Sequence, residues 1–182
     1  MIAHYHLPGL FEFYDFYSAF LPIFQEHKEF FYDWCDIASI YGAPSDAVWG
    51  GGRAGFGDTG PETEKRILAL ASRHGFSVRL AFSNSLLRTE HLSDRKCNRL
   101  AEIFHDSRNG IILHSDLLLD YMKRNFPDYY FVSSTTKVIE EFSGLEKELC
   151  REDFSFVVPD FRLNKEFRFL EKLPRQHKDK VE

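Results

Sequence analysis

The chain has 182 residues, of which 43% are hydrophobic, so it can bury one core but is short for two full domains. The net charge of −5 is modest and argues against a general nucleic-acid-binding surface. No run of about 18 apolar residues and no signal-peptide pattern is found, which predicts a cytoplasmic protein without a membrane span. Cys35, Cys97 and Cys150 are scattered and odd in number, as expected for reduced, structural thiols.

Six apolar runs that alternate with helical patterns predict a parallel α/β fold. The expected strands cover residues 2–7, 36–42, 76–83, 110–114, 129–134 and 154–159. Residues 110–138 are the central unit, because a strand, a polar turn, a helix stopped before Pro127 and a second strand follow in close order. Such a βαβ unit implies two parallel strands under one helix.

The connecting segments carry helical periodicity. The first, over about residues 12–34, is very aromatic, and its stripe is predicted to be core. That stripe comprises Phe16, Phe20, Ile23, Phe24, His27 and Phe31. A second helix begins at Pro61 and is capped by Gly75, and others end near residues 105, 126, 149 and 173. We expect residues 1–174 to form a single domain and residues 175–182 to be a mobile charged tail.

Two parallel architectures fit this rhythm. An open Rossmann-like sheet lacks its glycine fingerprint here, whereas a (β/α) barrel normally needs eight units and about 250 residues. The chain holds about six units, and residues 180–182 look like the approach to a seventh strand. The sequence therefore predicts a parallel, TIM-barrel-like (β/α) fold that is incomplete. Open barrel edges would favour self-association.

Candidate functional residues are polar and follow the predicted strands, where parallel α/β folds place their sites. They are Asp116, Asp160, Asn84 and Ser134 as catalytic candidates, and His6, Arg53 and Asn164 as substrate-binding candidates. Asp116 or Asp160 could act as a general base or metal ligand, and Arg53, in the glycine-rich stretch 49–57, as an anion clamp.

Each candidate also has an ordinary structural interpretation. Asp116 and Asn164 could be helix caps, and the glycine-rich stretch could be a surface loop. Ser134 has no base beside it in sequence. His4 and His6 would point to the same side of a strand, as half of a metal site or as hydrogen-bonded barrel residues.

Three stretches resemble the U32 collagenase-like peptidase group: residues 46–53 (DAVWGGGR), 80–87 (LAFSNSLL) and above all 110–138. The resemblance implies a TIM barrel, and some members of that group are linked to hydroxylation of tRNA or quinone precursors. An iron–sulfur cluster occurs in some relatives, but the cysteines that bind it lie beyond the sixth strand, past residue 182. The cofactor is therefore unknown from this chain.

Two classes of function remain open at this point. The first is a TIM-barrel enzyme of U32 type that acts on a small or tRNA-linked substrate. The second is a barrel-derived binding or scaffold protein without catalysis.

Overall fold

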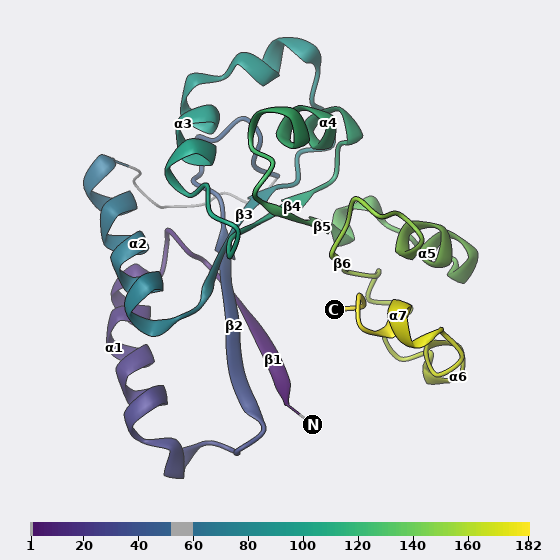
Figure 1. Ribbon diagram of the computed structural model, residues 1–182, viewed down its shortest axis with the longest axis horizontal. Coiled ribbons are helices and arrows are strands. Elements are labelled where there is room, and N and C mark those ends of the chain that lie inside the picture. Colours follow the sequence, from purple (N-terminus) through teal and green to yellow (C-terminus); the bar gives the residue numbers. More distant parts are fainter. Residues whose placement is uncertain (1, 52–59) are drawn as a thin grey trace.

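The computed structural model describes residues 2–51 and 60–182, which form a curled, six-stranded parallel sheet with helices along its outer side (Figure 1). The strands follow one another in chain order, and every neighbouring pair is parallel. A Rossmann-like sheet reverses its strand order at a switch point, whereas a (β/α) barrel does not. The fold is thus an incomplete TIM-barrel-like half-barrel, as predicted.

The strands are β1 Ala3–Pro8, β2 Cys35–Gly42, β3 Ser77–Phe82, β4 Gly110–Leu113, β5 Tyr130–Ser133 and β6 Phe156–Val157. The α-helices are α1 Tyr14–Glu26, α2 Pro61–His74, α3 Arg95–Ile103, α4 Asp116–Asn125, α5 Phe142–Leu149, α6 Phe167–Leu170 and α7 Arg175–Lys178. Short 3-10 turns are η1 Lys28–Phe30, η2 Thr89–Ser93 and η3 Thr135–Lys137. Strands β1 to β5 agree with the predicted ranges within one residue at each end, and β6 is shorter than its predicted range.

Alternation along β3 decides which side chains enter the core. Val78, Leu80 and Phe82 are fully buried in the cluster that includes Ile67 of α2 and Leu100 of α3. Burying one such side chain stabilises the fold by about 1.5–3 kcal/mol. The helices therefore pack on this apolar face of the sheet. Successive strand residues point to opposite faces, so Arg79 points to the concave side, called the lumen below.

The predicted signals at two helix ends are confirmed. Pro61 opens α2, and Gly75 ends it in the left-handed conformation at φ 75°, where a side chain would be strained. In α4, however, the N-cap is Ser115, whose side chain accepts a hydrogen bond from the Leu118 amide. Asp116 is the first helical residue and not the cap.

The aromatic stripe predicted for the first helix is partly wrong. The buried residues of α1 are Tyr17, Leu21 and Phe24, whereas Phe16 and Ile23 are 59% and 48% exposed. Apolar side chains surround much of this helix, so the spacing of its aromatic residues does not select the face that packs on the sheet.

The predicted mobile tail instead lies against the sheet. After α7, Val181 forms a parallel bridge with Val157 of β6. The Val157 amide donates to the Lys180 carbonyl at 2.8 Å, and the Glu182 amide donates to the Val157 carbonyl at 3.1 Å. Residues 181–182 therefore occupy the position of a seventh strand, on the inner side of the curve in Figure 1.

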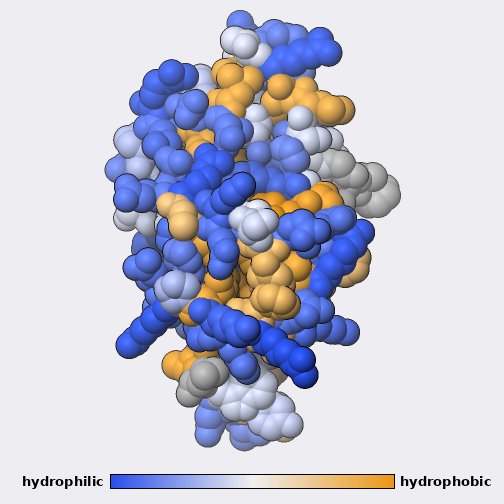
Figure 2. Space-filling model, turned by 90° about the vertical axis from the view of Figure 1, so that its right-hand side faces the viewer, coloured by the Kyte–Doolittle hydropathy of each residue, from blue (hydrophilic) through white to orange (hydrophobic). Residues whose placement is uncertain are grey.

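Figure 2 shows the right-hand side of Figure 1, where apolar side chains gather in the middle between hydrophilic ones. Phe161, Phe167 and Phe169 of the C-terminal part of the chain are among the exposed aromatic residues. Among the described residues, no helix has the length and apolar character that crossing a membrane requires.

Candidate functional site in the half-barrel

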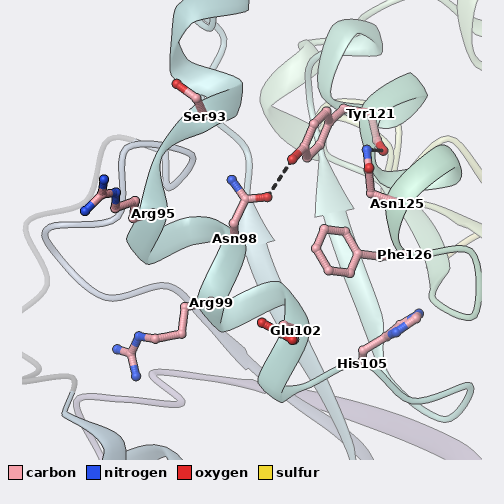
Figure 3. Close-up of a pocket in the computed structure, with 9 residues that line it drawn as sticks. All are labelled: Ser93, Arg95, Asn98, Arg99, Glu102, His105, Tyr121, Asn125 and Phe126. Atoms are coloured by element: carbon pink, nitrogen blue, oxygen red, sulfur yellow. Dashed lines mark hydrogen bonds between the residues drawn. The ribbon is translucent and has the colours of Figure 1, made fainter.

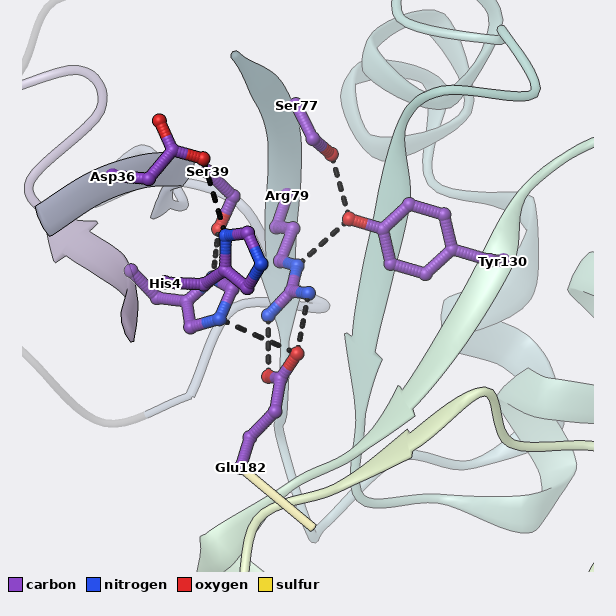
Figure 4. Close-up of polar contacts among 8 residues, drawn as sticks. His4, Asp36, Ser39, Ser77, Arg79, Tyr130 and Glu182 are labelled. Carbon is purple, nitrogen blue, oxygen red and sulfur yellow. Dashed lines mark hydrogen bonds and ion pairs between the residues drawn. The ribbon is translucent and has the colours of Figure 1, made fainter. Parts of the chain in front are cut away.

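A layer of four polar side chains crosses the lumen. His6 comes from β1, Arg79 from β3, Tyr130 from β5 and Glu182 from the seventh-strand position. Figure 4 shows Arg79, Tyr130 and Glu182 of this layer. In TIM barrels the lumen is filled by layers of four side chains from alternate strands, and branched aliphatic residues dominate them. These four residues, called the lumen layer below, also come from alternate strand positions, but their side chains are polar and not aliphatic.

The centre of the lumen layer is a two-pronged ion pair. Nη1 and Nη2 of Arg79 donate to the two carboxylate oxygens of Glu182 at 2.6 and 2.7 Å. Nε of Arg79 donates to the Tyr130 hydroxyl at 2.8 Å, and that hydroxyl lies 2.6 Å from Oγ of Ser77. The Arg79 side chain is only 4% exposed, so its charge depends on these partners.

His6 joins the layer from the edge of the sheet. Its Nε2 lies 3.4 Å from Glu182, and its Nδ1 lies 2.7 Å from Oγ of Ser39 in β2. The register of β1 against β2 shifts between Tyr5 and His6, and this irregularity brings Ser39 opposite His6. His4, on the same side of β1, pairs with Asp36 at 3.1 Å near the solvent.

Burial and charge act on the two bases of the layer in opposite directions. Burial and the positive charges of Arg79 and His4 lower the pKa of His6, against the opposing effect of Glu182. Burial alone would lower the pKa of Arg79, but the hydrogen bonds and charge of Glu182 and Tyr130 outweigh it and raise that pKa. The layer therefore holds a permanent cation beside a neutral imidazole near pH 7.

A second polar group lies at the carboxyl ends of β4 and β5. His114 follows β4, and its Nδ1 lies 3.1 Å from Oγ1 of Thr136. Thr136 Oγ1 lies 2.9 Å from Oγ of Ser134, the buried residue that follows β5. The Ser134 amide donates to the Leu113 carbonyl at 2.8 Å, which joins the two strand ends. An imidazole and two hydroxyls thus form a chain at the edge where barrel sites are found.

The other catalytic candidates make separate contacts. The carboxylate of Asp116, 67% exposed, pairs with Arg151 at 2.8 Å on the helical side of the sheet. Asp160 is buried and accepts hydrogen bonds from the backbone and side chain of Arg162, both at 3.0 Å. Asn84 donates to the Val48 carbonyl at 2.8 Å and joins the loops after β2 and β3.

The substrate-binding candidates are also spread out. His6 lies in the lumen layer, within β1 and not in the loop that follows it. Asn164 lies in an exposed turn, and since Glu166 is the N-cap of α6, the cap interpretation of Asn164 is wrong. Arg53 lies outside the described residues, so its predicted role as an anion clamp stays a prediction.

An open groove of about 610 Å³ lies between α3 and α4, outside the sheet (Figure 3). At its upper end, Tyr121 donates to Oδ1 of Asn98 at 2.7 Å, and Phe126 meets the ring of His105 edge-on. Its lining is polar, and both amide groups in it already bond to neighbouring backbone carbonyls. No sequence candidate lines this groove.

Metal binding finds little support in the described part of the chain. Residues 2–51 and 60–182 contain no group of three or more His, Cys, Asp or Glu side chains placed to hold one ion. Cys97 is buried, Cys35 is half-buried and Cys150 is exposed, each as a free thiol.

Sequence reasoning missed the partner of Arg79 and the imidazole beside Ser134. An arginine within the apolar run of β3 was a visible signal, because a charge in a buried strand requires a counter-charge. His114, directly after β4, belongs to the same class of strand-end residue as the candidates that were selected.

The arrangement defines the chain as a half-barrel of the (β/α) class, with polar residues in its lumen and at its carboxyl edge. Among solved structures, the fold of this chain is similar to the structure of the U32 peptidase Mk0906, with a TM-score of 0.56 and 14% sequence identity. The match covers 100% of this chain and 66% of that chain, so the chain spans less than two thirds of that structure. At this identity the similarity supports the fold alone. No protein-family model and no curated protein matches the sequence.

Proposed function

We propose that this half-barrel is a hydrolase that cleaves an amide or ester bond of a small or tRNA-linked substrate at the carboxyl ends of β4 and β5. The observation that carries the proposal is the chain of polar atoms from His114 through Thr136 to Ser134. The description of the structural neighbour as a U32 peptidase agrees with this reaction class.

The chemistry requires a nucleophile next to a base. Thr136 is exposed and its hydroxyl lies 3.1 Å from His114, which is half-buried. When Nδ1 of His114 is unprotonated, it can take the Thr136 proton as Oγ1 attacks the substrate carbonyl. The imidazolium then gives this proton to the departing amine or alcohol as the scissile bond breaks, and water hydrolyses the acyl-threonine ester to release the acid. The Thr136 hydroxyl donates to Oγ of Ser134 at 2.9 Å, so its hydrogen must turn towards His114 before the attack. Ser134, buried behind Thr136, is a positioning residue.

The remaining candidates surround this centre. Asn84 and Asp160 follow β3 and β6, on either side of the pair, and would contact the substrate. Asp116 would act indirectly, because its pairing with Arg151 orients α4, which begins two residues after His114.

Two neighbouring threonines provide a matched test. Thr136→Val removes the hydroxyl beside His114, whereas Thr135→Val removes one that donates to the Pro159 carbonyl at 3.1 Å. With a fluorogenic peptide library and p-nitrophenyl esters as probes, Thr136→Val and His114→Ala should lower kcat by about 10²- to 10⁴-fold. Thr135→Val should retain activity. Equal rates for Thr136→Val and the wild-type protein would refute the assigned nucleophile.

The alternative is a non-catalytic binding or scaffold protein. It is favoured by one observation, that the carboxylates of Asp116 and Asp160 are engaged by Arg151 and Arg162. A wild-type protein that hydrolyses none of the probes, with or without added divalent metal ions, would support this alternative over catalysis.

A further inference from the structure

The carboxyl group of Glu182 is held as a bound carboxylate ligand would be held. Both of its oxygens face the fork of Arg79, at 2.6 and 2.7 Å, and one also lies 3.4 Å from Nε2 of His6. Bidentate pairing of a guanidinium with a carboxylate gives geometric specificity as well as energy. Figure 4 shows the carboxylate facing the guanidinium of Arg79.

The receiving group is fixed by contacts that do not involve Glu182. The Tyr130 hydroxyl accepts from Nε of Arg79 and lies 2.6 Å from Oγ of Ser77. The rings of Tyr130 and Phe156 lie 5.3 and 5.1 Å from the guanidinium carbon, within the range of cation–π attraction. A cation held in this way needs no rearrangement to accept another carboxylate, which lowers the cost of binding.

The side chain of Glu182 is less enclosed than that of Arg79, at 13% exposed against 4%. Residues 181–182 join the sheet at the bridge from Val181 to Val157, and the Glu182 amide donates to the Val157 carbonyl at 3.1 Å. Lys180, just before them, is anchored by hydrogen bonds to the carbonyls of Leu149 and Arg151. The Glu182 side chain can therefore rotate away from Arg79 while α7 and β6 keep their backbone contacts. Water also reaches this place, since the side chains of Glu182 and His6 are 13% and 21% exposed.

We propose that the lumen layer is a binding site for a small carboxylate ligand, and that Glu182 occupies it until the ligand displaces it. The place that the Glu182 side chain fills suits a carboxyl group on a two-carbon arm. Arg79 binds the ligand carboxylate through both Nη atoms, and His6 contacts one of its oxygens. The site lies within the lumen, apart from the His114 and Thr136 pair, and does not depend on the hydrolase proposal.

Propionate is the probe, because it matches the arm of a glutamate side chain, and propionamide is its uncharged control. Binding is followed by calorimetry and by the NMR signal of the Arg79 Nε–H group. Glu182→Ala should bind propionate about tenfold or more tightly than the wild-type protein, since a tethered competitor acts at a millimolar effective concentration. Arg79→Gln should bind none, and propionamide should bind to neither protein. Glu171→Ala, which removes an exposed acid of the same C-terminal region, should behave as the wild-type protein.

Three results would overturn the proposal. The first is equal propionate affinity of the wild-type protein and Glu182→Ala. The second is binding that survives Arg79→Gln. The third is a wild-type Arg79 signal that propionate does not move at its highest concentration, because Glu182 would then be a permanent part of the layer. If Glu182→Ala does not fold by circular dichroism, Glu182→Gln replaces it, since it keeps the shape of the side chain and removes its charge.

Discussion

The ion pair of the lumen layer should respond asymmetrically to the loss of either partner. Arg79 is 4% exposed and stands within β3, so its charge has no route to water when Glu182 is lost. The Glu182 side chain is 13% exposed, so its carboxylate can rotate towards water when Arg79 is lost. Although the two residues share one Coulomb attraction, loss of Glu182 should therefore lower the stability of the fold more than loss of Arg79.

The magnitudes follow from burial. Removing one partner of a buried pair costs about 3–5 kcal/mol, because the other charge stays desolvated. We expect Glu182→Gln to lower the free energy of unfolding by about 3 kcal/mol, at the lower end because glutamine retains one acceptor. Arg79→Met should lower it by about 1.5 kcal/mol, the lower end of the range for hydrogen bonds to charged groups, because no charge is left trapped. The double variant Arg79→Met/Glu182→Leu should lie near the wild-type value.

Urea unfolding followed by tryptophan fluorescence measures these differences. Trp49 is fully buried between Phe82 and Tyr121, so its emission should change when the core opens. The double-mutant cycle gives the coupling energy, and constant m-values would show that the denatured state is unchanged. Equal costs for the two single variants, or a cost below about 1 kcal/mol for Glu182→Gln, would refute a buried pair in which only Glu182 can reach water.

Three further predictions concern single residues. Burial, helped by the charge of Arg79, lowers the pKa of His6 below 6.5, so the folded protein binds fewer protons than the unfolded chain. The free energy of unfolding should therefore fall as the pH drops below about 6.5, and His6→Gln should reduce this slope in pH-dependent urea titrations. Burial raises the pKa of the Cys97 thiol to about 12, so iodoacetamide should modify exposed Cys150 in the native protein and Cys97 only after unfolding, as read by mass spectrometry. A Cβ at Gly110 would overlap the Tyr130 ring, which hydrogen bonds hold in place, so Gly110→Ala should cost about 1–3 kcal/mol in the same unfolding assay.

The fold could be predicted because its signals are local. The alternation of Val78, Leu80 and Phe82 identifies β3 as a strand with one buried face, and Pro61 and Gly75 mark the ends of α2. Parallel pairing then follows from helices between strands. The buried face of α1 could not be selected in this way, because its apolar residues leave no single polar side.

The polar sites were harder to predict because their partners are distant in sequence. Arg79 and Glu182 are separated by 103 positions. Residues 180–182 resemble the approach to a seventh strand, but no local pattern indicates that Glu182 meets Arg79 across the lumen. His114 and Thr136 are 22 positions apart and meet only because β4 and β5 are neighbours. Ser134 was selected because it follows a strand. That it lies close to Thr136 and His114 could be known only from the register of β4 against β5.

An ionic layer suits a half-barrel better than an aliphatic one for a physical reason. In a closed barrel, branched aliphatic layers gain stability because they are removed from water on all sides. Within the described residues β1 has β2 as its one sheet neighbour, and water reaches the side chains of His6 and Glu182. Aliphatic side chains at these positions would be incompletely buried and would gain less from burial. Hydrogen-bonded polar side chains tolerate such partial hydration. Arg79 bonds directly to Tyr130 and Glu182 across the lumen, and Glu182 connects it to His6. Their directional contacts fix the distance between β1, β3, β5 and the seventh-strand position. The same layer that holds the curved sheet in shape is thus the part of the lumen in which a carboxylate can be recognised.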